Sequence, residues 1–117
     1  MFRYQEHIFA LVLGTDLPDS ILASLRADPT VLRSALDGWF ESRKAELDLD
    51  SLSVIAVEGG PREGNFELAF REASWQSCRM EWTSAPHNPR IRYRIEGPSL
   101  VLSTLPRDAF GERVDEL

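Results

Sequence analysis

The fold is decided by residues 28–57, which read DPTVLRSALDGWFESRKAELDLDSLSVIAV. In the first half of this stretch, apolar residues recur every three or four positions, as they do along one face of an amphipathic helix. From Leu47 onward the hydrophobic period becomes two, which is the period of a β-strand. We therefore expect a helix that runs up to Leu47 and strands after it. The inward stripe of this helix is expected to contain Leu32, Ala35, Leu36, Trp39, Phe40 and Arg43.

The chain before this stretch predicts one strand and a first helix. Residues 4–13 include a run of apolar residues without alternation, which favours a central strand covered on both faces or a strand in an oligomer interface. Asp16 suits a helix N-cap, and Pro18 suits the first turn of the helix that follows. Asp28 and Pro29 break the helical region into two, because proline lacks a backbone donor and disfavours helix at the residue before it.

The chain after this stretch predicts short strands separated by loops. The clearest strand is 66–71, in which Phe66, Leu68 and Phe70 alternate with polar residues. The other expected strands are 52–57, 78–82 with Cys78, Met80 and Trp82 facing inward, 91–95 and 100–105, with loops at 58–65 and 83–89 and a turn at Gly97-Pro98. The predicted order is β-α-α-β-β-β-β-β. This order indicates an α+β fold: a mostly antiparallel sheet of five or six strands with a broken helix packed on one face.

Composition predicts one small globular domain. The chain has 117 residues, of which 43% are hydrophobic and 27% charged, so it is too apolar to be disordered. The single cysteine excludes an internal disulfide and suits a reducing compartment, and no apolar run approaches the roughly 20 residues of a membrane span. We therefore expect a cytoplasmic protein. Twelve of the thirteen basic residues are Arg, which we interpret as the mark of a GC-rich bacterial or phage genome.

The chain is acidic, and its charge is uneven. The formal net charge is −6, which disfavours general nucleic-acid binding and binding to anionic membranes. Residues 1–60 carry ten acids and five bases, whereas residues 61–117 carry nine acids and eight bases. The helical half is therefore the half that would attract a basic partner. Residues 1–105 are expected to form the domain. The polar tail 106–117, with Phe110, Val114 and Leu117 as its apolar residues, is expected to dock on the domain or on a neighbour.

No motif in the chain predicts a reaction, a cofactor or a metal. Cys78 and His87 could mimic a thiol–imidazole pair, but we expect a core cysteine and a solvated loop histidine. The alternating acids at 46–50 lack the glycine and the final glutamate of a calcium loop. The loop 59–64 lacks the Gly-Lys-Ser/Thr ending of a phosphate loop. We therefore expect no catalytic residue, no cofactor and no metal site.

Arg90, Arg92 and Arg94 form the sharpest polar feature, because alternation places all three on one face of one strand. They could bind phosphate or an acidic partner. Alternatively, they pair with acids on adjacent strands, which would neutralise most of their positive electrostatic potential. The acids considered for this pairing are Glu67, Glu72 and Glu81.

Three further residues are candidates for binding a partner. Trp75 is out of phase with the inward residues that follow it, so it is either an exposed anchor or is turned back to the core by a bulge. Asp37 and Glu41 lie on the acidic outer face of the predicted second helix. With the three arginines, these residues complete the predicted partner-binding set.

These features predict a non-catalytic protein-binding protein of the inhibitor, immunity, anti-defence or chaperone type. It would act through its acidic helical face or its strand-borne Arg and Trp surface. One alternative is a small-ligand-binding protein or an enzyme, with a pocket between helix and sheet lined by Tyr93, Arg92 or Glu67. Another is a structural oligomer subunit of a phage or bacterium. A homodimer formed through an edge strand or the apolar first strand is also expected.

Overall fold

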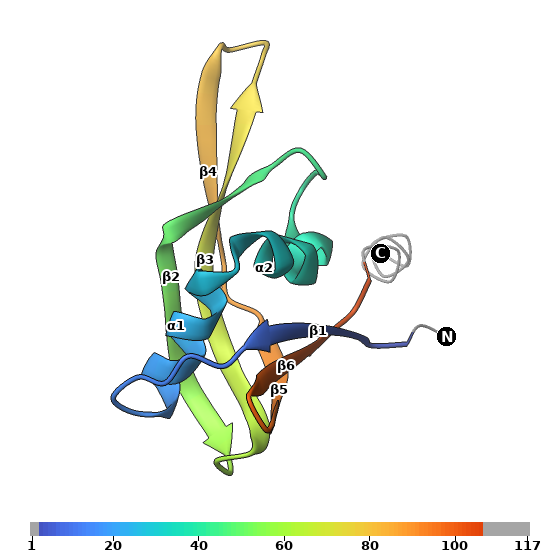
Figure 1. The fold of residues 1–117 in the computed structure, drawn as a ribbon. Coiled ribbons are helices and arrows are strands. Elements are labelled where there is room, and N and C mark those ends of the chain that lie inside the picture. Colours follow the sequence, from blue (N-terminus) through green and yellow to red (C-terminus); the bar gives the residue numbers. More distant parts are fainter. Residues whose placement is uncertain (1–2, 107–117) are drawn as a thin grey trace.

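The computed structural model describes residues 3–106, and it has two helices packed against a curled antiparallel sheet of six strands (Figure 1). The predicted α+β class and element order are confirmed. The predicted docking of the tail falls on residues 107–117, which lie outside the described part. The elements are β1 Gln5–Ala10, α1 Leu17–Ala27, α2 Pro29–Leu36, the 3₁₀ turn η1 Asp37–Trp39, β2 Glu46–Gly59, β3 Glu63–Gln76, β4 Glu81–His87, β5 Arg90–Glu96 and β6 Ser99–Thr104.

The strands follow the order β1-β6-β5-β3-β2, and β4 pairs with the C-terminal half of β3. The core lies between the two helices and the inner face of this sheet. It consists mainly of Phe9, Ile21, Leu25, Leu32, Leu36, Phe66, Leu68, Phe70, Ile91, Tyr93, Leu100 and Leu102. The alternation predicted for residues 66–70 and 91–95 is the alternation that fills this core.

The helix starts and the break between helices are where the sequence predicts them. The Asp16 carboxylate accepts a hydrogen bond from the Asp19 amide at 2.9 Å. The Asp28 carboxylate accepts one from the Val31 amide at 3.3 Å. Each bond satisfies a backbone donor that the first turn of a helix leaves without an intrahelical partner.

The second helix is shorter than predicted. It ends at Leu36 and is followed by η1 and a loop, instead of continuing to Leu47. Gly38 is one reason, because glycine is about 1 kcal/mol less favourable than alanine inside a helix. Arg33 is the other. Its guanidinium donates to the carbonyl groups of Ser42, Arg43 and Ala45 at 3.0–3.2 Å, so it holds these residues in a loop.

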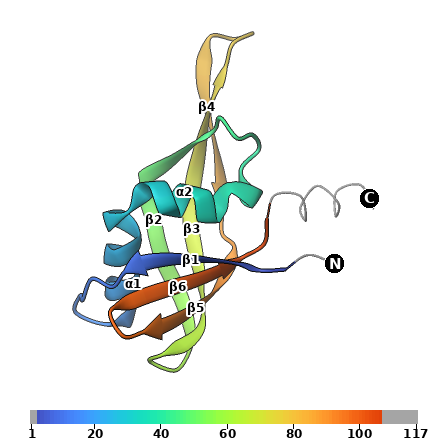
Figure 2. The same cartoon turned by 45° about the vertical axis from the view of Figure 1, so that its right-hand side comes forward.

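Of the two positions that the sequence favours for the first strand, the central one is wrong. β1 is the terminal strand of the sheet and pairs only with β6 among the described strands (Figure 2). Phe9 faces the core and is fully buried, whereas Ile8 on the opposite face is 63% exposed. The apolar run therefore reflects one face that packs on the core and one face that is open.

The last part of the sheet also differs from the prediction. Residues 77–80 form a turn, and β4 occupies most of the predicted loop 83–89. Cys78 is consequently exposed and is not a core cysteine. Trp82 is 56% exposed instead of inward. His87 is not a solvated loop residue, because it lies on β4 and contacts the inner side chains.

Candidate functional site

The feature that stands out from the body of the protein is the hairpin formed by the ends of β3 and β4. Figure 1 shows this hairpin extending past the helices. We call residues 74–83 the aromatic arm, because Trp75 and Trp82 lie within it. No residue of the arm is buried. The arm therefore contributes no buried residue to the core, and the two tryptophans of the arm are accessible to another molecule.

Trp75 and Trp82 stand directly opposite each other in the β3–β4 register. Their ring centroids are 5.8 Å apart, and the ring planes meet at 63°. Trp75 is 50% exposed and Trp82 is 56% exposed. Met80, in the adjoining turn, is 77% exposed. Two tilted indole rings of this kind form an open aromatic corner, and large exposed apolar groups that gather in this way mark interaction sites.

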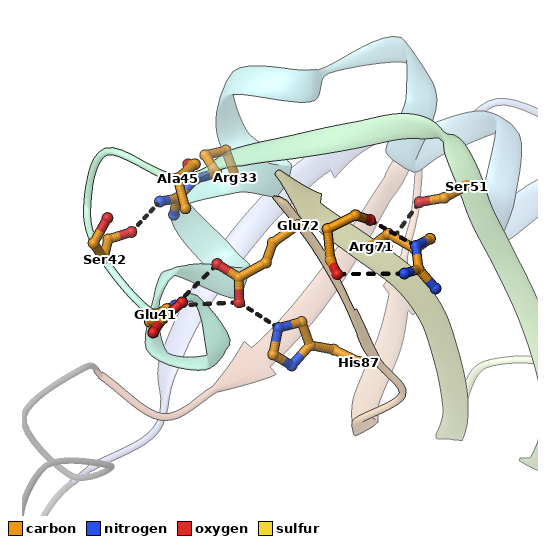
Figure 3. A network of polar contacts seen from close by, with 9 residues as sticks. Arg33, Glu41, Ser42, Ala45, Ser51, Arg71, Glu72 and His87 are labelled. Carbon is orange, nitrogen blue, oxygen red and sulfur yellow. Dashed lines mark hydrogen bonds and ion pairs between the residues drawn. The ribbon is translucent and has the colours of Figure 1, made fainter. Parts of the chain in front are cut away.

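A buried polar network anchors the base of the arm (Figure 3). The Glu72 carboxylate of β3 is only 3% exposed, and it lies 2.5 Å from His87 Nε2 of β4. The same carboxylate accepts hydrogen bonds from the Glu41 amide at 3.1 and 3.3 Å. The His87 ring stacks on Phe70 and Phe40, with centroids 5.2 and 6.3 Å apart. Strands β3 and β4 and the loop after η1 are therefore joined at one point.

A groove of about 380 Å³ separates the arm from the loop at 41–45. Trp75 and Trp82 line it on one side, and Glu41 and Lys44 line it on the other. Arg33 stabilises the loop side, because its guanidinium lies 3.8 Å from the centre of the Phe40 ring in addition to its bonds to the loop carbonyls. The groove therefore has two walls that are each held by contacts to the core.

The outer face of the sheet next to the aromatic corner carries acids. Glu46 is opposite Ala73 and Asp48 is opposite Arg71 in the β2–β3 register, so these side chains share the face that carries Trp75. Neither carboxylate forms an ion pair within residues 3–106. The Arg71 guanidinium instead donates to the Ser84 hydroxyl at 2.7 Å. Aromatic rings beside unpaired carboxylates are a combination that attracts cations.

The three arginines of β5 lie away from the arm, and two of them are already engaged. Arg94 pairs with Glu6 at 2.9 Å and with Glu96 at 2.5 Å, and these hydrogen bonds raise the pKa of Arg94. Arg90 donates to Asn65 and lies 3.9 Å from Glu58. Arg92 alone of the three has no ion pair with any residue of 3–106. The acids considered in the sequence (Glu67, Glu72 and Glu81) are not the ones that pair with them.

A larger polar hollow lies on the outer face of the sheet. It measures about 700 Å³ and is lined by Arg92, Arg94 and Asn65 among others. Tyr93, proposed as a pocket residue, is 3% exposed, and its hydroxyl donates to the Gly60 carbonyl at 2.7 Å. Burial raises the pKa of this phenol. Tyr93 therefore closes the β2–β3 turn, and although it lines this hollow together with Arg92, little of its side chain is accessible to a ligand.

The structure brings together only part of the predicted partner-binding set. Trp75 and Glu41 line the same groove, although Glu41 lies in a loop and not on the predicted helix. Asp37 is half-buried and pairs with Arg33 at 2.8 Å. Trp82 and Met80 are outside the predicted set, because alternation over 78–82 predicts a strand where the structure has a turn. The signal that could have found them is that Trp75 and Trp82 lie equally far along the sequence from residues 78–79. A hairpin with its turn at 78–79 would pair the two tryptophans.

Two further observations bear on the kind of protein. Within residues 3–106, no three His, Cys, Asp or Glu side chains lie close enough to hold a metal ion. None of the helices in this range has the length and apolar character required to cross a membrane. No protein-family model, curated protein or solved structure matches the chain.

Proposed function

We propose that the protein is a non-catalytic protein-binding module that holds a basic segment of a partner on the aromatic arm. The observation that carries the proposal is the pair of half-exposed tryptophans on a projecting hairpin. Tryptophan is among the residues that most often dominate binding energy at interfaces. A globular domain has no folding reason to expose two of them side by side.

The basic character of the partner follows from the charges around the corner. Lysine and arginine side chains bind the faces of indole rings through cation–π contacts. Glu46 and Asp48 on the same outer face and Glu41 across the groove add three carboxylates, against two cations, Lys44 in the groove and Arg71 opposite Asp48, so the balance of charge favours a cation. Nucleic acid and anionic membrane surfaces are less suited, because the chain carries a net charge of −6.

Inhibitor, immunity, anti-defence and chaperone proteins all work by binding another protein, and the proposal is common to these classes. We place the protein in the cytoplasm of a bacterium or of a phage-infected cell, where an exposed thiol such as Cys78 stays reduced. Apolar side chains pack between the helices and the sheet, and the hollow of about 470 Å³ between α2 and the start of β2 is open to the surface, so a binding surface suits this chain better than an internal pocket.

The test is a binding titration with a lysine- and arginine-rich peptide as the probe, followed by calorimetry or by the fluorescence anisotropy of a labelled peptide. Replacing both Trp75→Ala and Trp82→Ala should weaken binding by about 30-fold, which corresponds to the loss of roughly 2 kcal/mol at an interface hot spot. Glu46→Gln with Asp48→Asn should weaken it less and should reduce its salt dependence. An acidic peptide of equal length should bind poorly.

The matched control is Ile55→Ala, because Ile55 is also an exposed apolar side chain (43%) but lies on β2 away from the arm. It should leave the affinity unchanged, and so should Arg92→Glu on the β5 face. Equal binding by the wild-type protein and the double tryptophan variant would refute the proposal. Failure of the wild-type protein to bind the basic peptide would refute the basic character of the partner.

A further inference from the structure

A second exposed apolar surface lies on the outer face of β1. Tyr4, Ile8 and Val12 are 56%, 63% and 39% exposed. Alternation along β1 places Ile8 on the face opposite Phe9, and Tyr4 and Val12, just beyond the two ends of β1, continue the even-numbered phase, whereas Leu11 packs on the core. We call Tyr4, Ile8 and Val12 the β1 stripe. It is separate from the aromatic arm, which is formed by β3 and β4, so the proposed function leaves it without a role.

The spacing of the stripe is symmetric about Ile8. Tyr4 precedes Ile8 by the same number of residues as Val12 follows it. If two copies meet antiparallel about a two-fold axis at Ile8, Ile8 contacts Ile8 of the second copy and Tyr4 contacts Val12 of the second copy. A surface that is complementary to itself in this way is what a two-fold dimer requires.

We propose that the β1 stripe is the interface of a homodimer whose two-fold axis passes beside Ile8. The charges agree with a second copy as the occupant. Glu6, which lies within the stripe, is neutralised by Arg94 at 2.9 Å on the same face. In the antiparallel alignment, Glu6 is opposite Ala10 of the second copy, so no like charges face each other.

The stripe carries no net charge, because Glu6 is the one charged residue among the even-numbered positions 4–12 and Arg94 pairs with it. An uncharged apolar surface gives no preference to a basic or an acidic partner and fits an equally uncharged copy of itself. By the same alternation Arg3 and Leu13 are out of phase with the stripe, so they take no part in this contact.

The dimer is tested by sedimentation equilibrium or light scattering at concentrations from about 1 µM to about 1 mM, which brackets the affinities of small interfaces. The wild-type mass should rise with concentration from 13.3 kDa toward twice that value. Ile8→Lys and Ile8→Glu should each remain monomeric, because each places two like charges at the axis. An equimolar mixture of the two variants should associate again, because unlike charges then meet there.

Three control variants test whether the association depends on the β1 stripe. Ile55→Lys adds the same charge at an exposed apolar position on β2 and should dimerise like the wild-type protein. Ile8→Thr keeps a β-branched strand residue and should weaken association without altering the circular dichroism spectrum. The double tryptophan variant of the arm should dimerise normally.

Three results would overturn the proposal. The first is a wild-type protein that stays monomeric over the whole range. The second is a mixture of the Ile8→Lys and Ile8→Glu variants that fails to associate. The third is a chain ending at Pro106 that dimerises when the full chain does not, because residues 107–117 would then be the occupant of the stripe.

Discussion

Glu72 is the residue that joins the arm to the rest of the structure. Its carboxylate is buried at the base of the aromatic arm and contacts His87 and the Glu41 amide (Figure 3). Burying a carboxylate is costly unless it is hydrogen-bonded and compensated by charge. The protein accepts this cost at the one place where β3, β4 and the loop after η1 meet. Glu72 therefore determines how the arm is oriented relative to the groove wall.

Replacing Glu72→Ala should destabilise the protein by about 1–3 kcal/mol, because the Glu41 amide and the His87 ring lose their partner. Urea denaturation measures the change in the free energy of unfolding. Glu72→Gln is the matched control, since it keeps the shape and can still accept the amide bond, so it should cost less. A Glu72→Ala variant as stable as the wild-type protein would contradict the anchoring role of this carboxylate.

At the scale of elements, the β2–β3 hairpin depends on its glycines. Gly59 has a φ of +113°, a region that side chains rarely adopt. A Cβ atom on Gly64 would lie 2.1 Å from the Glu58 carbonyl oxygen, whereas one on Gly60 would meet nothing closer than 3.9 Å. The two strands therefore approach each other at a distance that only glycine permits at position 64.

Gly64→Ala should consequently destabilise the protein, by more than about 1 kcal/mol, because the backbone of the hairpin must shift to admit the methyl group. Gly60→Ala provides the control and should change the free energy of unfolding by less than about 0.5 kcal/mol. Thermal unfolding of the two variants side by side measures the difference. Equal effects would mean that the hairpin tolerates a wider separation of its strands.

The elements that the sequence predicts well are those determined by local patterns. Asp16 and Asp28 cap their helices through side chains that reach only three residues along the chain. The alternation over 66–70 leaves one strand register in which all three apolar side chains are buried. The same holds for Ile91 and Tyr93 on β5. Local chemistry and packing agree at these places, so the pattern is sufficient.

The elements that the sequence predicts poorly depend on contacts between distant residues. The end of α2 is determined in part by Arg33, which contacts carbonyl groups at 42–45. The turn at 77–80 contains no Gly, Pro or Asn, and Met80 adopts a φ of +52°, so Ser77 is the one residue within it that favours a turn. An apolar run such as Ile8–Leu13 has the same period whether both faces are covered or one is open. The aromatic corner is not predicted because the sequence does not mark the turn at 77–80 that brings Trp75 and Trp82 together.

At the scale of the whole molecule, the two proposed surfaces are independent of each other and of the core. The aromatic arm extends past the helices, and the β1 stripe lies on the terminal strand at the other end of the sheet order (Figures 1 and 2). A dimer formed through the stripe would therefore carry two arms, each available to a partner. Two arms on one particle would raise the avidity for a partner that presents repeated basic segments.

This arrangement predicts that the arm can be removed without loss of the fold. Replacing residues 75–82 by an Asn-Gly turn between Ser74 and Thr83 deletes no buried side chain, and the Glu72–His87 pair that anchors the hairpin remains. The shortened protein should unfold cooperatively with a midpoint within about 5 °C of the wild-type value, since about 1 kcal/mol corresponds to roughly 4–8 °C in a domain of this size. It should still dimerise, and it should not bind the basic peptide. Calorimetry, light scattering and the peptide titration measure these three properties separately.

A shortened protein that is stable and still binds the peptide would place the binding surface elsewhere. One that fails to fold would show that the arm contributes to the core after all.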